Sequence, residues 1–208
     1  MITVPYPNTD RSLLTIEQLR AAAGLATDDT SQDAMLTPLG GYISAAITTA
    51  CKVARAGALP PTLRLETVVE TFRLKSCQPS LVLARHPVVE IETLVTSGST
   101  IDYELDAAAG ILYSLSGDAH VNWGIGPVEI TYSAGYEDVP DDLVYAAQRF
   151  VQGELAAVSR DPSLKRLKIE GISEREWWVP TNQTRDSIIP ADVMDILVSG
   201  GYVNMVVK

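Results

Sequence analysis

Residues 128–155 change from the hydrophobic period of a strand to that of a helix, and this change constrains the fold more than any other feature of the chain. Apolar residues at alternate positions from Val128 to Tyr132 predict a half-buried strand. Gly135 permits a turn, and Pro140 suits the first position of a helix, where its missing N–H has no partner to lose. A single apolar stripe of helical spacing follows, made of Leu143, Ala147, Phe150, Val151, Leu155 and Val158.

Four carboxylates surround that proline: Glu137, Asp138, Asp141 and Asp142. The last two would fall in the first helical turn, where negative charge complements the helix dipole. A cation site is the alternative, but Pro140 interrupts the alternate-residue spacing of a calcium loop. Helix capping is the favoured interpretation.

Two helices are predicted near the N-terminus. Thr15 to Gln18 matches a capping box, which predicts a short helix ending at Gly24. A second helix is expected from Asp33 to about Arg55, with Pro38 in its first turn or at its start, because a deeper proline would break it. We expect the helix that follows Pro140 to pack against this second helix.

The run from Ala34 to Cys51 carries no charge and therefore invites comparison with a membrane span. Pro38, two glycines and four Ser/Thr residues instead favour a packed helix of a soluble protein. The first ten residues lack the basic and apolar regions of a signal peptide, so none is expected.

From Leu63 onward the hydrophobic period is two, and glycine turns separate short runs. One predicted strand follows Pro87 and places Val89, Ile91, Thr93 and Val95 on one side. The predicted fold class is α+β: a small helical bundle packed with an antiparallel β-meander of short strands, plus an extended C-terminal arm.

We expect a division into a core of residues 1–160 and an arm of residues 161–208. Within the arm, Leu167 to Val179 predicts a strand or extended segment, and Pro190 starts a closing helix that Gly200 ends. The apolar tail that follows suggests a binding partner, although an edge strand added to its own domain is an equal alternative. The candidate partner-binding residues are Trp177, Trp178, Ile196, Leu197, Tyr202, Val203, Met205, Val206 and Val207.

Composition argues against most chemistry. The net charge is −10 and no dense Lys/Arg cluster exists, which argues against a protein that grips nucleic acid. Two cysteines and two histidines lack the spacing of a disulfide framework or a zinc site. The run Ser116 to His120 contains Ser, Asp and His, but five neighbouring residues cannot fold into a catalytic relay. No catalytic residue, metal site or cofactor is predicted.

The order of motifs resembles the head–tail connector (adaptor) proteins of long-tailed double-stranded-DNA bacteriophages and related gene-transfer particles. The resemblance rests on the paired helices of Thr15 to Arg55, on Arg85-His-Pro-Val-Val-Glu-Ile91, and on Tyr103-Glu-Leu-Asp106 followed by Gly110. The most specific element is Ile130-Thr-Tyr-Ser-Ala-Gly-Tyr136 with Val139-Pro140 and its helix. Together these motifs cover most of residues 13–158.

The resemblance implies a structural protein of the virion neck, assembled in the host cytoplasm. Such adaptors form a ring, usually of twelve copies, that joins the portal protein to stopper or tail proteins around the DNA channel, and their C-terminal segments dock on the portal. DNA would pass through without specific binding, and no membrane is involved. Two other hypotheses stay open: a small enzyme using the acidic cluster at 137–142 with His120, and a binding domain with Trp177 and Trp178 as its hot spot.

Overall fold

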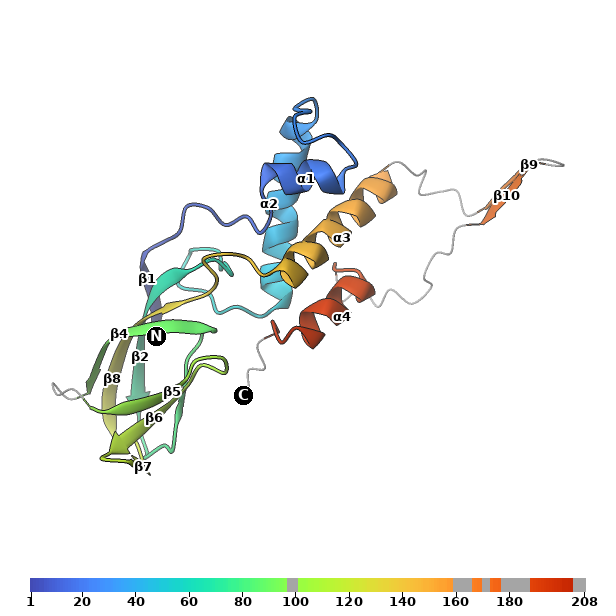
Figure 1. Ribbon diagram of the computed structural model, residues 1–208. Coiled ribbons are helices and arrows are strands. Elements are labelled where there is room, and N and C mark those ends of the chain that lie inside the picture. The colour runs from blue at the N-terminus through green and yellow to red at the C-terminus, as the bar shows by residue number, and fades with distance from the viewer. Residues whose placement is uncertain (97–100, 159–165, 170–172, 177–187, 204–208) are drawn as a thin grey trace. The chain divides into compact units, whose positions relative to one another are not determined.

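The computed structural model describes residues 1–96, 101–158, 166–169, 173–176 and 188–203 (Figure 1). The chain forms two compact units. The first combines Met1–Leu13 with Thr48–Pro140 and also takes Val203, and the second combines Leu14–Ile47 with the described part of Asp141–Tyr202. Each unit therefore draws on stretches that are separate in the sequence. The predicted boundary between a core of 1–160 and an arm of 161–208 stays a prediction.

The first unit contains two antiparallel sheets. The larger sheet has the order β1 (Ile2–Tyr6), β2 (Glu66–Leu74), β8 (Gly126–Ala134) and β4 (Val88–Thr96). The smaller sheet has the order β3 (Leu81–Val82), β6 (Ile111–Ser116) and β5 (Tyr103–Asp106), with β7 (Ala119–Val121) also pairing with β6. Neighbouring strands pair consecutively in β5, β6 and β7, as in a meander, whereas β8 lies between strands much earlier in the sequence.

The combination of helices with antiparallel sheets confirms the predicted α+β class. The two sheets of the first unit share one hydrophobic core. Strand β8 is its centre, because Val128, Ile130, Tyr132 and Ala134 are all buried. The alternation predicted for this strand is therefore correct. Its face packs with buried side chains of both sheets, namely Val68, Leu81, Leu83, Val88, Leu94, Leu112 and Trp123.

The side-chain alternation predicted for β4 is wrong. Val89 and Val95 are exposed, whereas Val88 and Leu94 are buried and Ile91 is half-buried. The register against β8 shifts twice, once between Val88 and Glu90 and once between Ile91 and Thr93. Each bulge inserts one extra residue and moves the following side chains to the other face, so the buried positions recur at every third residue.

Gly135 ends β8 where two backbones nearly touch. Its φ is +107°, and a Cβ added there would lie 2.6 Å from the carbonyl oxygen of Arg64. The same crossing is held by hydrogen bonds from the Tyr136 amide to Leu63 and from the Leu65 amide to Tyr136. Only glycine combines this backbone conformation with this approach.

The second unit is helical, and its elements in chain order are α1 (Ile16–Ala22), α2 (Asp33–Ala50), α3 (Asp141–Val158) and α4 (Ala191–Ser199). Helix α1 has the predicted capping box between Thr15 and Gln18. Both α1 and α4 pack on α3, and the rings of Tyr42 and Phe150 bring α2 and α3 together with centroids 6.5 Å apart. The predicted pairing of these two long helices is therefore present.

Helix α2 differs from its prediction in two ways. It ends at Ala50, because Lys52 adopts the left-handed conformation with φ 56°, and does not continue to Arg55. Pro38 is the sixth residue of the helix and not part of its first turn. The proline is tolerated because Pro38 and Ala34 both lie on the exposed side, where water can bind the carbonyl that lacks a helical donor.

The remaining helix boundaries follow the predicted signals. Pro140 directly precedes α3, with Asp141 and Asp142 in its first turn, and Pro190 and Gly200 cap α4. Part of the predicted arm forms an antiparallel hairpin of β9 (Arg166–Ile169) and β10 (Ser173–Glu176). Among the described helices, none combines the length and the hydropathy needed to cross a bilayer.

Candidate interaction surfaces

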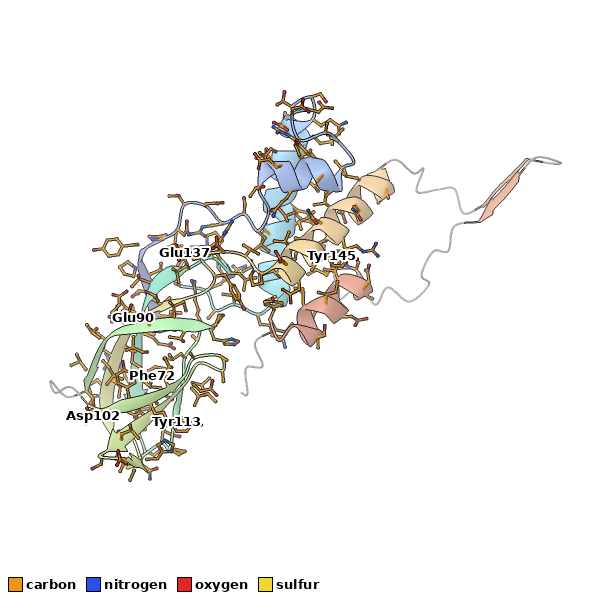
Figure 2. All side chains as sticks on the ribbon, in the orientation of Figure 1. Phe72, Glu90, Asp102, Tyr113, Glu137 and Tyr145 are labelled. Atoms are coloured by element: carbon orange, nitrogen blue, oxygen red, sulfur yellow. The ribbon has the colours of Figure 1, made fainter. Side chains whose placement is uncertain are left out.

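The residues that suggested catalysis in the sequence have structural partners. His120 stacks on Tyr113 with ring centroids 4.8 Å apart, and its Nε2 lies 2.5 Å from Oε2 of Glu104. These three side chains come from the neighbouring strands β5, β6 and β7, and Figure 2 labels Tyr113 on this sheet. The arrangement links three strands on the exposed face of the smaller sheet, and it gives Ser116 no part in a relay with His120.

Of the acidic cluster beside Pro140, Asp141 and Asp142 lie in the first turn of α3. The Asp142 carboxylate accepts a 2.9 Å hydrogen bond from the Leu143 amide and another from the Tyr202 hydroxyl. Within the part of the chain that the structure describes, no group of three or more His, Cys, Asp or Glu side chains could hold a metal ion. Burial raises the pKa of the Cys51 thiol to about 12, so this cysteine stays protonated and unreactive.

A buried ion pair, which sequence analysis missed, lies inside the first unit. The Arg85 guanidinium binds the Glu66 carboxylate, and the two side chains are only 4% and 1% exposed. Arg85 also donates to the Ala54 carbonyl over 3.1 Å, while Glu66 accepts from the Asn8 amide over 2.9 Å. The pair therefore ties the N-terminal segment, the loop after α2 and the loop before β4 to strand β2.

A second buried carboxylate, that of Glu70, lies four residues after Glu66 on the same face of β2. Oε2 of Glu70 accepts hydrogen bonds from the Ala84 amide at 2.9 Å and from the Tyr132 hydroxyl at 3.0 Å. Burial raises the pKa of Glu70, and these two hydrogen bonds oppose the shift only in part. The same Tyr132 hydroxyl accepts from the Arg85 amide at 3.3 Å, which joins both carboxylates into one network.

One signal in the sequence could have revealed this network. Glu66 and Glu70 are each two residues from Val68 in strand β2. Side chains two residues apart in a strand lie on the same face, so both glutamates point into the core with Val68. A buried carboxylate requires a partner, and Arg85 begins the loop motif that carried part of the family resemblance. The network holds loops in place and does not expose a group for chemistry.

Two surfaces that the described residues leave exposed are distinctive. The exposed side of α2 displays Met35 and Tyr42, which are 48% and 46% exposed. The outer face of the larger sheet is polar, and there Glu92 accepts hydrogen bonds from Thr67 and Ser133. The first surface suits a protein partner and the second suits contact with water.

The candidate partner-binding residues differ in burial. Leu197 is fully buried and Tyr202 nearly so, with the Tyr202 ring lying over Gly200. Ile196 and Val203 are half-buried. Trp177, Trp178, Met205, Val206 and Val207 lie outside the described residues. Partner binding by this set stays a prediction, and on α4 the exposed apolar side chain is Val198, which was not among the candidates.

Comparison with known proteins finds likeness in structure alone. No protein-family model matches the chain, and no curated protein matches its sequence. A chain in the neck of an empty GTA particle computed with C6 symmetry superposes with a TM-score of 0.53 at 16% identity, covering 80% of this chain and 89% of that one. A chain in the virion of the native gene transfer agent (GTA) particle gives a TM-score of 0.50 at 18% identity, covering 79% and 88%. At these identities the shared property is the fold, and it agrees with the resemblance noted in the sequence.

Proposed function

We propose that this protein is a head–tail connector (adaptor) of a tailed phage or a related gene-transfer particle. In this role it forms an oligomeric ring, of twelve copies in the mature neck, between the portal protein and the stopper or tail proteins. The observation that supports the proposal best is the agreement between the motif order over residues 13–158 and the fold likeness to a GTA neck chain. The location that follows is the virion neck, after assembly in the host cytoplasm.

Charge supports the same role. The chain carries a net charge of −10, and DNA passing through the ring would be repelled by an acidic wall. Asp142, Glu66 and the pair of His120 with Glu104 make structural contacts, in a first helical turn, a buried ion pair and a link between strands respectively. A ring of identical copies needs two different faces on each copy that match when the rotation closes.

The test is assembly with the portal protein of the same particle. The purified full-length chain is mixed with portal rings, and the product is analysed by light scattering and by electron microscopy. We expect a ring of this chain seated on one end of the portal. If the full-length chain does not bind the portal, the proposal is wrong.

The proposed docking of the C-terminal tail on the portal needs a truncation that leaves α4 intact. Removal of residues 187–208 would delete Val193 and Leu197, which are both buried in the second unit. A chain ending at Tyr202 keeps these side chains and removes only the tail. This shorter chain should fold normally and bind the portal at least tenfold more weakly. Unchanged binding would assign the docking to another surface.

A further inference from the structure

The exposed side of α2 carries no charge, which is unusual for a helix surface that faces water. Its residues are all exposed and lie on one side of the helix: Ala34, Met35, Pro38, Gly41, Tyr42 and Ala45. We name this surface the α2 face. The opposite side packs inward through Leu36, Ile43 and Ile47, which are completely buried.

Helix α3 of the same unit provides the contrast. Its exposed positions include Asp141, Asp142 and Arg149, and Arg149 pairs with Asp192 of α4 at 2.9 Å. Figure 2 labels Tyr145 on this helix, where an exposed aromatic ring shares the surface with charged residues. The α2 face instead combines a tyrosine and a methionine with small residues and no charge, which is the composition of the centre of a protein interface.

Helix α2 contains two consecutive glycines, Gly40 and Gly41, and only the first is explained by packing within the described chain. At Gly40 an added Cβ would lie 2.8 Å from Cδ1 of Leu19, so packing of α1 explains this glycine. At Gly41 an added Cβ would meet nothing within 4 Å. A glycine inside a helix destabilises it relative to alanine, and packing among the described residues gives no reason for Gly41. Close approach of another molecule would explain it.

We propose that the α2 face is the surface through which one copy of this chain contacts the next copy in the ring. This inference rests on the proposed function, because it assumes that copies assemble. The argument for a second copy is electrostatic: each copy carries a net charge of −10, so copies repel one another across charged surfaces. Like charges brought together in an interface weaken binding strongly, and an uncharged face avoids this repulsion. The neighbouring copy contributes a different surface, as a closed ring requires.

The first experiment places one negative charge in this face. Ala45 is exposed, and glutamate is nearly as good a helix former as alanine, so Ala45→Glu should leave the melting temperature of the free chain unchanged. Gln32→Glu is the matched control, because Gln32 is exposed just before α2 and the variant has the same net charge. We expect Ala45→Glu to raise the dissociation constant of the ring tenfold or more, and Gln32→Glu to change it less than twofold. Equal effects of the two variants, or an intact ring with Ala45→Glu, would overturn the inference.

A second experiment reads the contact without introducing a charge. In a Cys77→Ser background the remaining native cysteine, Cys51, is buried, so Ala45→Cys provides the accessible thiol. Maleimide should label this thiol rapidly in the free chain and at least tenfold more slowly in the ring, whereas Gln32→Cys should label equally in both. Slow labelling in the free chain would mean that the chain covers its own α2 face, and equal rates in ring and free chain would also refute the contact.

The two proposals can fail separately. A wild-type ring on the portal together with an unaffected Ala45→Glu ring would remove the α2 contact and leave the connector function standing. Failure of the wild-type chain to assemble or to bind the portal would remove both.

Discussion

Replacing Arg85 with methionine tests the importance of the buried ion pair. Methionine keeps most of the side-chain volume but removes the nearer of the two guanidinium groups that pair with Glu66, which is 1% exposed. The other, that of Arg11, lies 3.9 Å from the second carboxylate oxygen. Breaking a buried pair by removing one partner destabilises a protein by about 3–5 kcal/mol. The variant also loses the hydrogen bond from Arg85 to the Ala54 carbonyl, while Arg11 still lies close to Glu66, so a loss within this range is expected.

The expected effect is large enough to measure by thermal unfolding. For a chain of this size, each kcal/mol shifts the melting temperature by about 2–4 °C, so Arg85→Met should lower it by roughly 6–20 °C. Near-ultraviolet circular dichroism can follow the loss of packing around Trp123, whose indole is buried in the first unit and donates to the Leu112 carbonyl.

A double variant separates loss of the pair from loss of packing. In Glu66→Gln with Arg85→Met, the buried carboxylate that has lost its nearer partner is gone, so the double variant should be more stable than Arg85→Met alone. A decrease of less than about 1 kcal/mol in Arg85→Met would refute the reasoning, since that is the range of exposed pairs. A double variant less stable than Arg85→Met would contradict the charge argument as well.

Three further predictions concern other residues. Gly135→Ala should destabilise the chain by about 2 kcal/mol or more, as measured by urea denaturation. Gly117→Ala should destabilise it less, because both glycines have a positive φ but an added Cβ has open space only at Gly117. Burial raises the pKa of Glu70 above its ordinary value of 4.5, so its contribution to stability is complete below pH 4.5 and is lost as the pH rises through the folded-state pKa. Glu70→Gln should remove this loss, and urea denaturation at several pH values would show a flatter pH dependence than that of the wild type. In the native chain a thiol reagent should modify Cys77 rapidly and Cys51 only on unfolding, and rapid reaction of both would contradict the burial of Cys51.

Local signals in the sequence were sufficient for the starts of α1 and α3 and for the end of α4, although not for the end of α2. The capping box at Thr15, the proline before Asp141 and the glycine after Ser199 each act within one or two helical turns. The geometry of each of these signals depends only on residues close to it in the sequence, so the helix end can be predicted from the sequence alone. The strand alternation of β8 was predictable for the same reason.

Features that depend on distant residues were not predictable in this way. The two bulges of β4 arise from its register against β8, and no residue type within β4 predicts them. Arg85 meets Glu66 only after β2 and the loop before β4 have come together. The uncharged run in α2 was visible in the sequence, but the division into a buried side and an exposed side required the fold. The candidate surface therefore emerged from the structure, and the family resemblance from the sequence.

The interleaving of the two units has a consequence for synthesis of the protein. Strand β2 pairs with β8, and helices α1 and α2 pack on α3, which are both much later in the sequence. Neither unit can therefore complete its fold until residues 126–158 have left the ribosome. Pairings this distant in sequence slow folding, because a long loop must be ordered first. A chain that terminates early would lack the central strand and the helix on which the second unit packs. Only chains that extend through α3 would then complete both units, and the fold itself would select against shorter ones.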